Sequence, residues 1–384
     1  MIHGHRELAA HLSDYLTDQW KAAFDATPRH VFVPDQAFVS VAGDKVYIDR
    51  EADPEAWIDA AYQDAAIITQ FDDGKGHGPG LRTSSCSMPQ VVLSMLTALN
   101  VERGQRVLEI GAGTGYNAAL LAHRLGAENW TSVEIDPDVA EQARTNLRKL
   151  RRSVTVVTGD GVDGYPPGAP YDRIIATAAV RAGRLPYPWV QQTAPGGMIL
   201  TPWGTSFRNG ELVQLVVQSD GTAVGTIVDA VAFMHLRSQR SPLGAARFGE
   251  LIEHSTFAAE SLTTVCPTEV TADADCEFTI GLFLTDVQRS LARDDPQSDT
   301  YELLLYDVAT GSAATVRVTP AHTAKGRFPV RQLGPRRLWD ELETAYAWWV
   351  THDRPARTHY GITITCNAQT VWLGHLSNIV AVSR

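Results

Sequence analysis

A group of closely spaced glycines in the first half of the chain is the feature with the clearest chemical meaning. It follows the apolar segment 106–110 and consists of Gly111, Gly113 and Gly115. The residues from about Tyr116 onward have a helical pattern. Glycines allow a tight turn and a close approach of the main chain to a ligand, and the first N–H groups of a helix attract electron-rich groups. The pattern therefore indicates a ligand-binding loop between a strand and a helix.

The spacing of these glycines argues against a dinucleotide or a triphosphate as the ligand. A dinucleotide fold uses G-x-G-x-x-G, and Tyr116 occupies the position of the third glycine. The lysine of a Walker motif is also missing from the sequence. Glu109 instead places an acidic group directly before the loop, which suits a ligand with a cationic amino-acid end.

Two further acidic residues follow the next two predicted strands. Glu134 ends the first of these strands, where a carboxylate can accept hydrogen bonds from both hydroxyls of a ribose. Asp160 and Gly161 form the turn after the second strand, where a carboxylate can accept the exocyclic amine of adenine. The alternatives are a solvated carboxylate at a strand end for Glu134 and a turn aspartate with local hydrogen bonds for Asp160.

Composition limits the classes of protein to consider. The chain has 384 residues, of which 44% are hydrophobic, and its formal net charge is -11. The apolar fraction is typical of a globular protein with a buried core, and the acidic excess argues against nucleic acids and membrane surfaces as partners. The four cysteines form no C-x-x-C pair, and no apolar run reaches the length of a membrane span. We therefore expect a cytoplasmic protein.

Histidines do not predict a metal site. His3, His5 and His77 lie in irregular segments without the helical spacing that zinc ligands use. We expect them at the surface, and we expect no metal.

The order of elements predicts the fold class. Apolar runs alternate with helical patterns over residues 81–235, which is typical of βαβ units and a doubly wound parallel sheet with helices on both faces. Residues 1–80 are expected to be a largely helical segment, and residues 236–384 an additional C-terminal α+β domain. In that domain, residues 265–284 have a strand-like composition. Residues 335–352 have a helical pattern whose apolar stripe we expect to be core: Trp339, Leu342, Tyr346 and Trp349.

Seven motifs in order narrow the interpretation further. They are PRHVFVP at 28–34, AYQDAAI at 61–67, SMPQVV at 87–92, VLEIGAGTGYNAALLA at 107–122, GDGVDGYP at 159–166, YDRIIATAA at 171–179 and GGMILTPWG at 196–204. Together they resemble the protein-L-isoaspartate O-methyltransferase family of class I S-adenosylmethionine-dependent methyltransferases. This resemblance implies a Rossmann-like core at 81–235 that binds S-adenosyl-L-methionine, with residues 1–80 contributing to the site of the methyl acceptor.

The resemblance also assigns individual residues. Ser87 of the S-x-P segment is implied as the catalytic residue at the acceptor pocket, although a helix N-cap before Pro89 is the alternative. The implied cofactor-binding residues are Glu109, Gly111, Gly113, Gly115, Glu134, Asp160 and Gly161. The implied substrate-binding residues are Tyr62, Asp64, Ser85, Pro89 and Thr177.

Two departures from the family pattern shape the functional prediction. The segment 65–87 is longer and more polar than in the family, and residues 236–384 extend beyond it. In its length the chain resembles family members that are encoded with ribosomally made, modified peptides, of the lanthipeptide or graspetide aspartimide-forming type. This resemblance implies O-methylation of an aspartyl or isoaspartyl carboxylate in a peptide or protein, which leads through the methyl ester to a succinimide (aspartimide) or isoaspartate. The expected partner is a dedicated ribosomal peptide of the macrocyclic kind, which residues 236–384 would recognise.

Two other functions stay open at this point. General repair of isoaspartate in damaged proteins is the alternative within the same enzyme class. A binding protein that kept the cofactor fold without catalysis is the alternative from another class.

Overall fold

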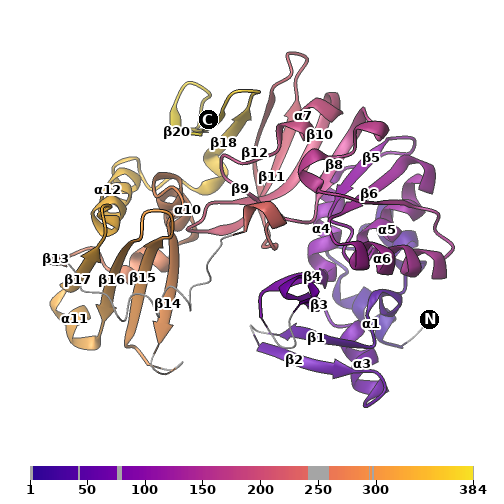
Figure 1. The fold of residues 1–384 in the computed structure, drawn as a ribbon, viewed down its shortest axis with the longest axis horizontal. Helices are drawn as coiled ribbons and strands as arrows, with labels where there is room; N and C mark the ends of the chain where they lie inside the picture. Colours follow the sequence, from indigo (N-terminus) through magenta and orange to yellow (C-terminus); the bar gives the residue numbers. More distant parts are fainter. Residues whose placement is uncertain are drawn as a thin grey trace. The chain divides into compact units, whose positions relative to one another are not determined.

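The computed structural model describes residues 3–41, 44–75, 80–240, 259–293, 295 and 298–383, and the chain divides into two compact units (Figure 1). The first unit lies within Met1–Ala179, Pro186–Pro202 and Val213–Val224. The second lies within Val180–Leu185, Trp203–Leu212 and Gly225–Arg384. The expected three-part division at residues 80 and 235 stays a prediction.

A largely parallel sheet forms the centre of the first unit. Its strand order is β12-β11-β10-β8-β5-β6-β7, and β5 pairs in parallel with both β6 and β8. All four residues of β5 are buried, as expected for a parallel strand that is covered on both faces. The predicted Rossmann-like α/β sheet is therefore confirmed. The strand bounds are β5 Val107–Ile110, β6 Trp130–Glu134, β7 Thr155–Thr158, β8 Tyr171–Ala176, β10 Thr193–Gly204, β11 Asn209–Val217 and β12 Ala223–Ala230.

Helices and short 3-10 turns precede and connect these strands. Helix α6 shows how the sequence sets their ends: the Asp136 side chain accepts hydrogen bonds from the N–H groups of Asp138 and Val139, and Pro137 takes the first helical position. The helices are α1 His3–His11, α2 Asp18–Asp25, α3 Pro54–Ala61, α4 Pro89–Leu99, α5 Tyr116–Leu125, α6 Pro137–Lys149 and α7 Tyr187–Gln192. The 3-10 turns are η1 Arg29–Phe32, η2 Asp72–Gly74, η3 Ala127–Asn129, η4 Gly161–Asp163 and η5 Pro166–Gly168.

A small antiparallel sheet near the N-terminus was not expected from the sequence. Its order is β2-β1-β3-β4. Phe38 of β1 lies against Tyr47 of β2 and Phe71 of β3, with ring centroids 5.2 and 5.3 Å away. Strand β4 ends directly before Ser87, so this sheet carries the predicted acceptor segment. The bounds are β1 Gln36–Val41, β2 Asp44–Asp49, β3 Ala66–Phe71 and β4 Arg82–Cys86.

The second unit contains two groups of strands. The first group follows the order β20-β19-β18-β12 and continues into the ends of β11 and β10, and β9 pairs with β10. The other group is an antiparallel sheet of order β13-β17-β16-β15-β14. The strand bounds are β9 Val180–Arg181, β13 Ala259–Thr263, β14 Gln288–Arg293, β15 Tyr301–Asp307, β16 Ser312–Val318, β17 Phe328–Leu333, β18 Tyr360–Ile364, β19 Gln369–Leu373 and β20 Ile379–Ser383. The helical elements are η6 Arg237–Gln239, α9 Pro267–Ala272, α10 Ala274–Phe283, α11 Pro320–Lys325, α12 Leu338–Thr351 and η7 Arg357–His359.

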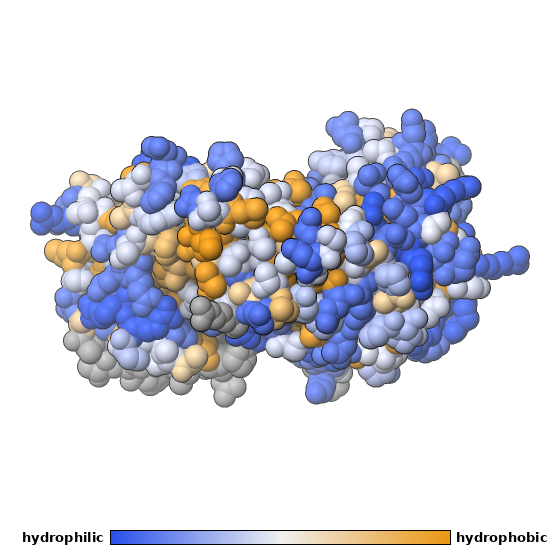
Figure 2. Space-filling view, turned by 90° about the horizontal axis from the view of Figure 1, so that it is seen from above, coloured by the Kyte–Doolittle hydropathy of each residue, from blue (hydrophilic) through white to orange (hydrophobic). Residues whose placement is uncertain are grey.

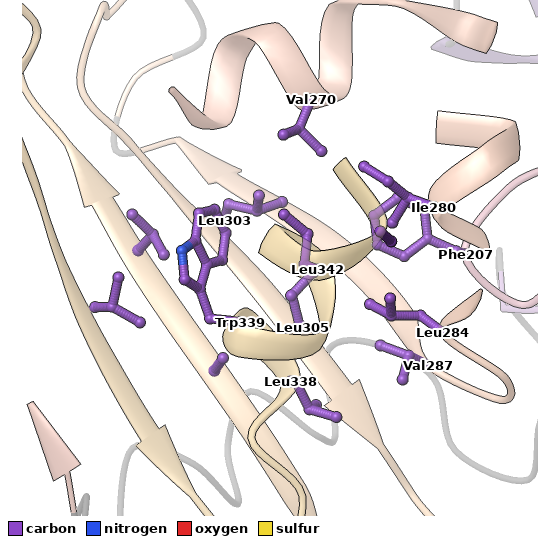
Figure 3. Close-up of a cluster of buried hydrophobic side chains, with 14 of the residues drawn as sticks. Phe207, Val270, Ile280, Leu284, Val287, Leu303, Leu305, Leu338, Trp339 and Leu342 are labelled. Carbon is purple, nitrogen blue, oxygen red and sulfur yellow. The ribbon is translucent and has the colours of Figure 1, made fainter. Parts of the chain in front are cut away.

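Helix α12 and the antiparallel sheet enclose an apolar core in this unit. Figure 3 shows Trp339 and Leu342 of α12 among Leu303 and Leu305 of β15. Trp349 belongs to the same buried cluster, and Tyr346 packs against it. The prediction that these residues form a core stripe is confirmed.

One element of this unit was wrongly predicted. Residues 265–284 were expected to be a strand but contain helices α9 and α10. Helix α10 is buried on nearly all sides, so no polar face reveals its period, and its start is set by the Asp273 side chain, which caps the N–H groups of Asp275 and Cys276.

Hydrophilic residues cover much of the surface that Figure 2 shows, with apolar residues in smaller patches between them. Apolar side chains exposed singly are normal in globular proteins. In the part of the chain that the structure describes, no helix combines the length and the hydrophobicity that crossing a membrane requires.

A network of ion pairs lies inside the second unit. Glu211 is fully buried and pairs with Arg208 at 2.9 Å and with Arg357 at 2.8 Å. Arg208 also pairs at 2.8 Å with Glu277, which is almost fully buried. These pairs join β11, α10 and η7 through charges that have little access to water.

We expect Glu211→Gln to lower the free energy of unfolding by about 2 kcal/mol, because Arg208 and Arg357, which are 22% and 23% exposed, each lose one of their carboxylate partners. Urea unfolding followed by circular dichroism measures this change. The matched control is Glu302→Gln, since Glu302 forms an ion pair of 3.0 Å with Arg331 at a much more exposed position. Its loss is expected to cost less than about 1 kcal/mol. Equal losses in the two variants would contradict the argument from burial.

Candidate active site

The glycine loop between β5 and α5 adopts the geometry that its sequence requires. Gly111, Gly113 and Gly115 all have positive φ angles, of 97°, 52° and 87°. A Cβ atom at Gly111 would lie 2.8 Å from the hydroxyl oxygen of Thr177. Because a side chain would close this space, the loop keeps a cradle of bare main chain at the carboxyl end of β5.

Thr177 fixes the other side of this cradle. It follows β8, and its hydroxyl donates to the carbonyl oxygen of Gly111 at 2.5 Å. Its main-chain N–H donates to the carbonyl oxygen of Ile110 at 2.9 Å. The structure thus places this predicted substrate residue against the glycine loop.

Glu134 lies directly beside the glycine loop. One carboxylate oxygen accepts a hydrogen bond from the N–H of Gly113 at 2.9 Å, and the other accepts from the N–H of Asp136 at 3.1 Å. The side chain is 8% exposed. This brings a carboxylate to the cradle, at the end of β6 where the sequence predicted it.

Glu109 is placed differently from the carboxylate that the sequence suggested beside a cationic ligand. It is fully buried, and its oxygens accept hydrogen bonds from Asn117 at 2.7 Å and Ser132 at 2.6 Å. Burial raises the pKa of Glu109 to about 7, against the opposing effect of the bonds from Ser132 and Asn117. The side chain ties β5 to β6 and α5 under the loop, and its contact with a cofactor stays a prediction.

The turn that contains Asp160 and Gly161 packs against the end of β5. A Cβ atom at Gly161 would lie 2.4 Å from the Cγ2 atom of Ile110, and the buried Trp189 donates a hydrogen bond of 2.8 Å to the Gly161 carbonyl oxygen. Asp160 is exposed and accepts a local hydrogen bond of 3.0 Å from the N–H of Val162. The structure therefore brings this turn to the edge of the sheet that holds the glycine loop, and its predicted contact with adenine stays a prediction.

Residues Ser85–Pro89, here called the acceptor turn, lie beside the same loop. They join β4 to α4, and Pro89 is buried at the first position of that helix. The carbonyl oxygen of Ser85 would be 3.2 Å from a Cβ atom at Gly113. The predicted acceptor residues and the predicted cofactor loop, far apart in the sequence, are therefore neighbours.

Two predicted substrate residues make contacts within the protein. The Tyr62 hydroxyl lies 2.6 Å from Nδ1 of His30, and burial raises the pKa of Tyr62 to about 12. Asp64 accepts a hydrogen bond of 2.9 Å from the N–H of Gln90. The structure places both side chains in the scaffold of the acceptor turn, and their contact with a substrate stays a prediction.

Sequence reasoning missed two polar residues near this site. Gln70 of β3 donates to Asp136 at 3.2 Å and accepts from Thr83 at 2.8 Å, so it links the β3–β4 hairpin to the start of α6. Arg29 donates to main-chain carbonyl oxygens around the acceptor turn. The motif PRHVFVP marked the position of Arg29 but not its contacts, which depend on distant residues.

One histidine was wrongly predicted. His5 was expected at the surface, but it is 3% exposed and its ring lies 4.7 Å from that of Phe24. The ring of Tyr62 meets the His5 ring edge-on, with 5.6 Å between the ring centroids. His77 lies outside the described residues. Among the described residues there is no group of three His, Cys, Asp or Glu side chains that could hold a metal ion.

A family model and several curated relatives match this chain. The family model "Protein-L-isoaspartate(D-aspartate) O-methyltransferase (PCMT)" matches residues 6–241. The protein-L-isoaspartate O-methyltransferase of Thermococcus onnurineus is 40% identical over 160 residues, which are 41% of this chain and 70% of that protein. The one from Methanoculleus marisnigri is 35% identical over 219 residues, which are 57% of this chain and 83% of that protein.

A similarity of fold extends over almost the whole chain. A solved structure titled "protein-L-isoaspartate O-methyltransferase" covers 97% of this chain and 100% of its own, with a TM-score of 0.54 and 23% sequence identity. This match concerns the fold alone, and it includes most of residues 236–384.

We expect Gly111→Ala to weaken the binding of S-adenosylhomocysteine at least 10-fold, because a methyl group would strain the main chain and press on Thr177 inside the cradle. Isothermal titration calorimetry measures the affinity. Gly104→Ala is the matched control, since Gly104 has a φ of 87° and nothing lies within 4 Å of a Cβ atom there. The control is expected to lose some stability but no affinity. If Gly111→Ala bound S-adenosylhomocysteine as tightly as the wild type, Gly111 would not form part of the cofactor site.

We expect Glu109→Gln to stabilise the fold at pH 8 by on the order of 2 kcal/mol. The folded state raises the pKa of Glu109 from 4.5 to about 7, so above pH 7 the wild-type protein must hold a buried ionised carboxylate. Below pH 4.5 the carboxyl is protonated in both the folded and unfolded states, and this cost is gone. The advantage of the variant should therefore shrink as the pH falls from 8 through 7 toward 4.5.

Urea unfolding of both proteins at pH 8, 6 and 4.5 tests this prediction. Glu51→Gln, at an exposed position, is the control for the change of charge alone. An advantage that is constant with pH would show that burial of the Glu109 charge is not its cause.

Proposed function

The chain belongs to the protein-L-isoaspartate(D-aspartate) O-methyltransferase family, and we propose that it methylates isoaspartyl carboxylates in polypeptides as a general repair enzyme. The reaction class is S-adenosylmethionine-dependent methyl transfer, EC class 2.1.1. The observation that carries the proposal is the position of the acceptor turn, whose Ser85 carbonyl would lie 3.2 Å from a Cβ atom at Gly113 of the glycine loop. This supports a methyl acceptor that binds at the turn and a methyl donor that binds at the neighbouring loop.

The residues at the cradle fit the cofactor of this family. S-adenosyl-L-methionine, when bound, supplies a methyl group on a positively charged sulfur. We propose that Gly111, Gly113 and Gly115 accommodate its amino-acid end, that Glu134 accepts hydrogen bonds from its ribose, and that the Asp160–Gly161 turn faces its adenine. The fit rests on the positive φ angles of the glycines and on the space that a Cβ atom at Gly111 would fill.

Methyl transfer to a carboxylate demands orientation more than acid–base chemistry. A carboxylate oxygen is already ionised and nucleophilic at pH 7, so it can form the bond to the methyl carbon as the carbon–sulfur bond breaks, without a general base. Correct alignment of the two groups can supply several kcal/mol of the barrier. We propose that the Ser87 hydroxyl donates to one carboxylate oxygen and so directs the other.

The ester formed in this way is a better acyl group than the carboxylate. The main-chain nitrogen of the following residue can attack it, close a succinimide and release methanol. Water then opens the ring to aspartate or isoaspartate. This second stage requires no further catalytic group from the protein.

Tailoring of a dedicated ribosomal peptide, with a succinimide or isoaspartate as its product, is the second candidate function. Its support is the long polar segment 65–87 in the acceptor region together with residues 236–384. The comparisons favour general repair, because the relatives are protein-L-isoaspartate O-methyltransferases and a solved structure with that title shares the fold over 97% of the chain. The cytoplasm stays the predicted location.

Mass spectrometry of peptides incubated with the protein and S-adenosyl-L-methionine tests the proposal. We expect a gain of one methylene on a linear isoaspartyl peptide and none on its aspartyl counterpart. Methylation of a constrained peptide encoded beside the gene, without turnover of the linear isoaspartyl peptide, would favour tailoring. No mass change on any of the peptides would favour the non-catalytic binding protein.

In the same assay we expect Ser87→Ala to lower kcat by roughly 10- to 100-fold, the effect of losing one hydrogen bond to a charged group. Ser84→Ala is the control, because the Ser84 hydroxyl accepts its hydrogen bond from Thr69, within the β3–β4 hairpin. Equal activity of Ser87→Ala and the wild type would remove Ser87 from the mechanism.

A further inference from the structure

Arg29 is a buried charged residue that the proposed chemistry does not use. It begins η1 and is 1% exposed. Its terminal nitrogens donate to five main-chain carbonyl oxygens. The distances are 3.0 Å to Ala61, 2.9 Å to Gln63, 2.7 Å to Ala65, 3.4 Å to Cys86 and 3.1 Å to Ser87.

These acceptors come from two separate segments. Ala61 is the last residue of α3, and Gln63 and Ala65 lie between α3 and β3; the carbonyl groups of all three accept from the guanidinium. Cys86 and Ser87 belong to the acceptor turn. Because a guanidinium stays charged at all relevant pH values and is costly to bury, its hydrogen bonds hold both segments in one arrangement.

Asp64 holds the same turn from its other end. Its carboxylate accepts a hydrogen bond of 2.9 Å from the N–H of Gln90, in the first turn of α4. The carbonyl oxygens of residues 86 and 87 are thus fixed by a cation and the N–H of residue 90 by an anion. Ser87 lies within this short span of fixed main chain.

We infer, on the basis of the proposed function, that Arg29 and Asp64 are positioning residues for methyl transfer. They hold the main chain of the acceptor turn, whose Ser85 carbonyl lies near Gly113 of the glycine loop, so that Ser87 keeps one place within the turn. Neither residue needs to touch the substrate, because both act through the main chain of residues 86–90. A shift of about 1 Å in such a group can cost on the order of 100-fold in rate.

Arg29→Lys is the sharpest test, since it keeps the charge but replaces the planar fork by three donors on one nitrogen. With a linear isoaspartyl peptide as substrate, we expect kcat to fall by on the order of 100-fold while the affinity for S-adenosylhomocysteine stays that of the wild type. The cofactor side of the cradle is formed by other residues. A fall in kcat without a loss of affinity for S-adenosylhomocysteine is therefore specific to the acceptor turn.

Arg173→Lys is the matched control. Arg173 also donates to three main-chain carbonyl oxygens, those of Leu99, Asn100 and Asp172, but it lies near the amino end of β8. It is expected to lose stability with little loss of kcat. Equal losses of kcat in the two lysine variants, or full kcat in folded Arg29→Lys, would overturn the inference.

Two further measurements keep the test decisive if Arg29→Lys does not fold. Asp64→Ala frees the N–H of Gln90, and we expect it to lower kcat while the affinity for S-adenosylhomocysteine stays unchanged. Its control is Asp53→Ala, which removes the N-terminal cap of α3. In Arg29→Ala, added methylguanidinium should restore part of kcat, and methylammonium at the same concentration should not. Full kcat in Asp64→Ala, or equal rescue by both cations, would overturn the inference.

The wild-type protein separates this inference from the proposed function. If the wild type methylates the isoaspartyl peptide but the variants show no fall in kcat at unchanged affinity for S-adenosylhomocysteine, the positioning role fails and the function stands. If the wild type methylates none of the peptides, the proposed function itself fails.

Discussion

A charged group that is removed from water must be surrounded by polar partners, and this constraint organises the acceptor side of the first unit. Arg29 is surrounded by carbonyl oxygens from the stretch after α3 and from the acceptor turn. A single buried cation therefore joins the residues just before β3 to those at the end of β4, next to the point where the two strands begin to pair at Ile67 and Cys86. The small antiparallel sheet then completes the arrangement, since β4 delivers the chain directly to Ser87.

The cofactor side depends on a different kind of constraint, which is local in the sequence. A strand, a run of glycines and a helix follow one another at Val107–Leu125, and each glycine supplies a main-chain conformation that its own position requires. Because parallel strands place their carboxyl ends at one edge, Glu134 and the Asp160 turn reach the same edge without any long-range information. This is why the loop, the acidic residue after β6 and the fold class could all be predicted from sequence patterns.

The parts that escaped prediction are those that depend on contacts between distant residues. The β1–β2 hairpin is held by aromatic packing of Phe38 on Tyr47 and Phe71, and its short strands carry too weak an alternation to be recognised alone. Helix α10 lacks a polar face, so the pattern of its apolar residues wrongly predicts a strand. His5 was expected at the surface because nothing in its own segment reveals that Phe24 and Tyr62 will cover it.

The difference between these local and long-range constraints suggests how the substrate specificity of such an enzyme can change while its methyl-transfer site stays the same. The cradle tolerates little variation, since a side chain at Gly111 or Gly161 would meet Thr177 or Ile110. Apart from the carboxylate of Asp64, the acceptor turn is held through main-chain carbonyl groups, which any residues at positions 61, 63, 65, 86 and 87 provide. Side chains at these five positions can therefore vary while the turn keeps its place. A polar, lengthened segment such as 65–87 is thus compatible with an unchanged methyl-transfer geometry, and differences in substrate choice would arise from the side chains that surround the same arrangement of main chain.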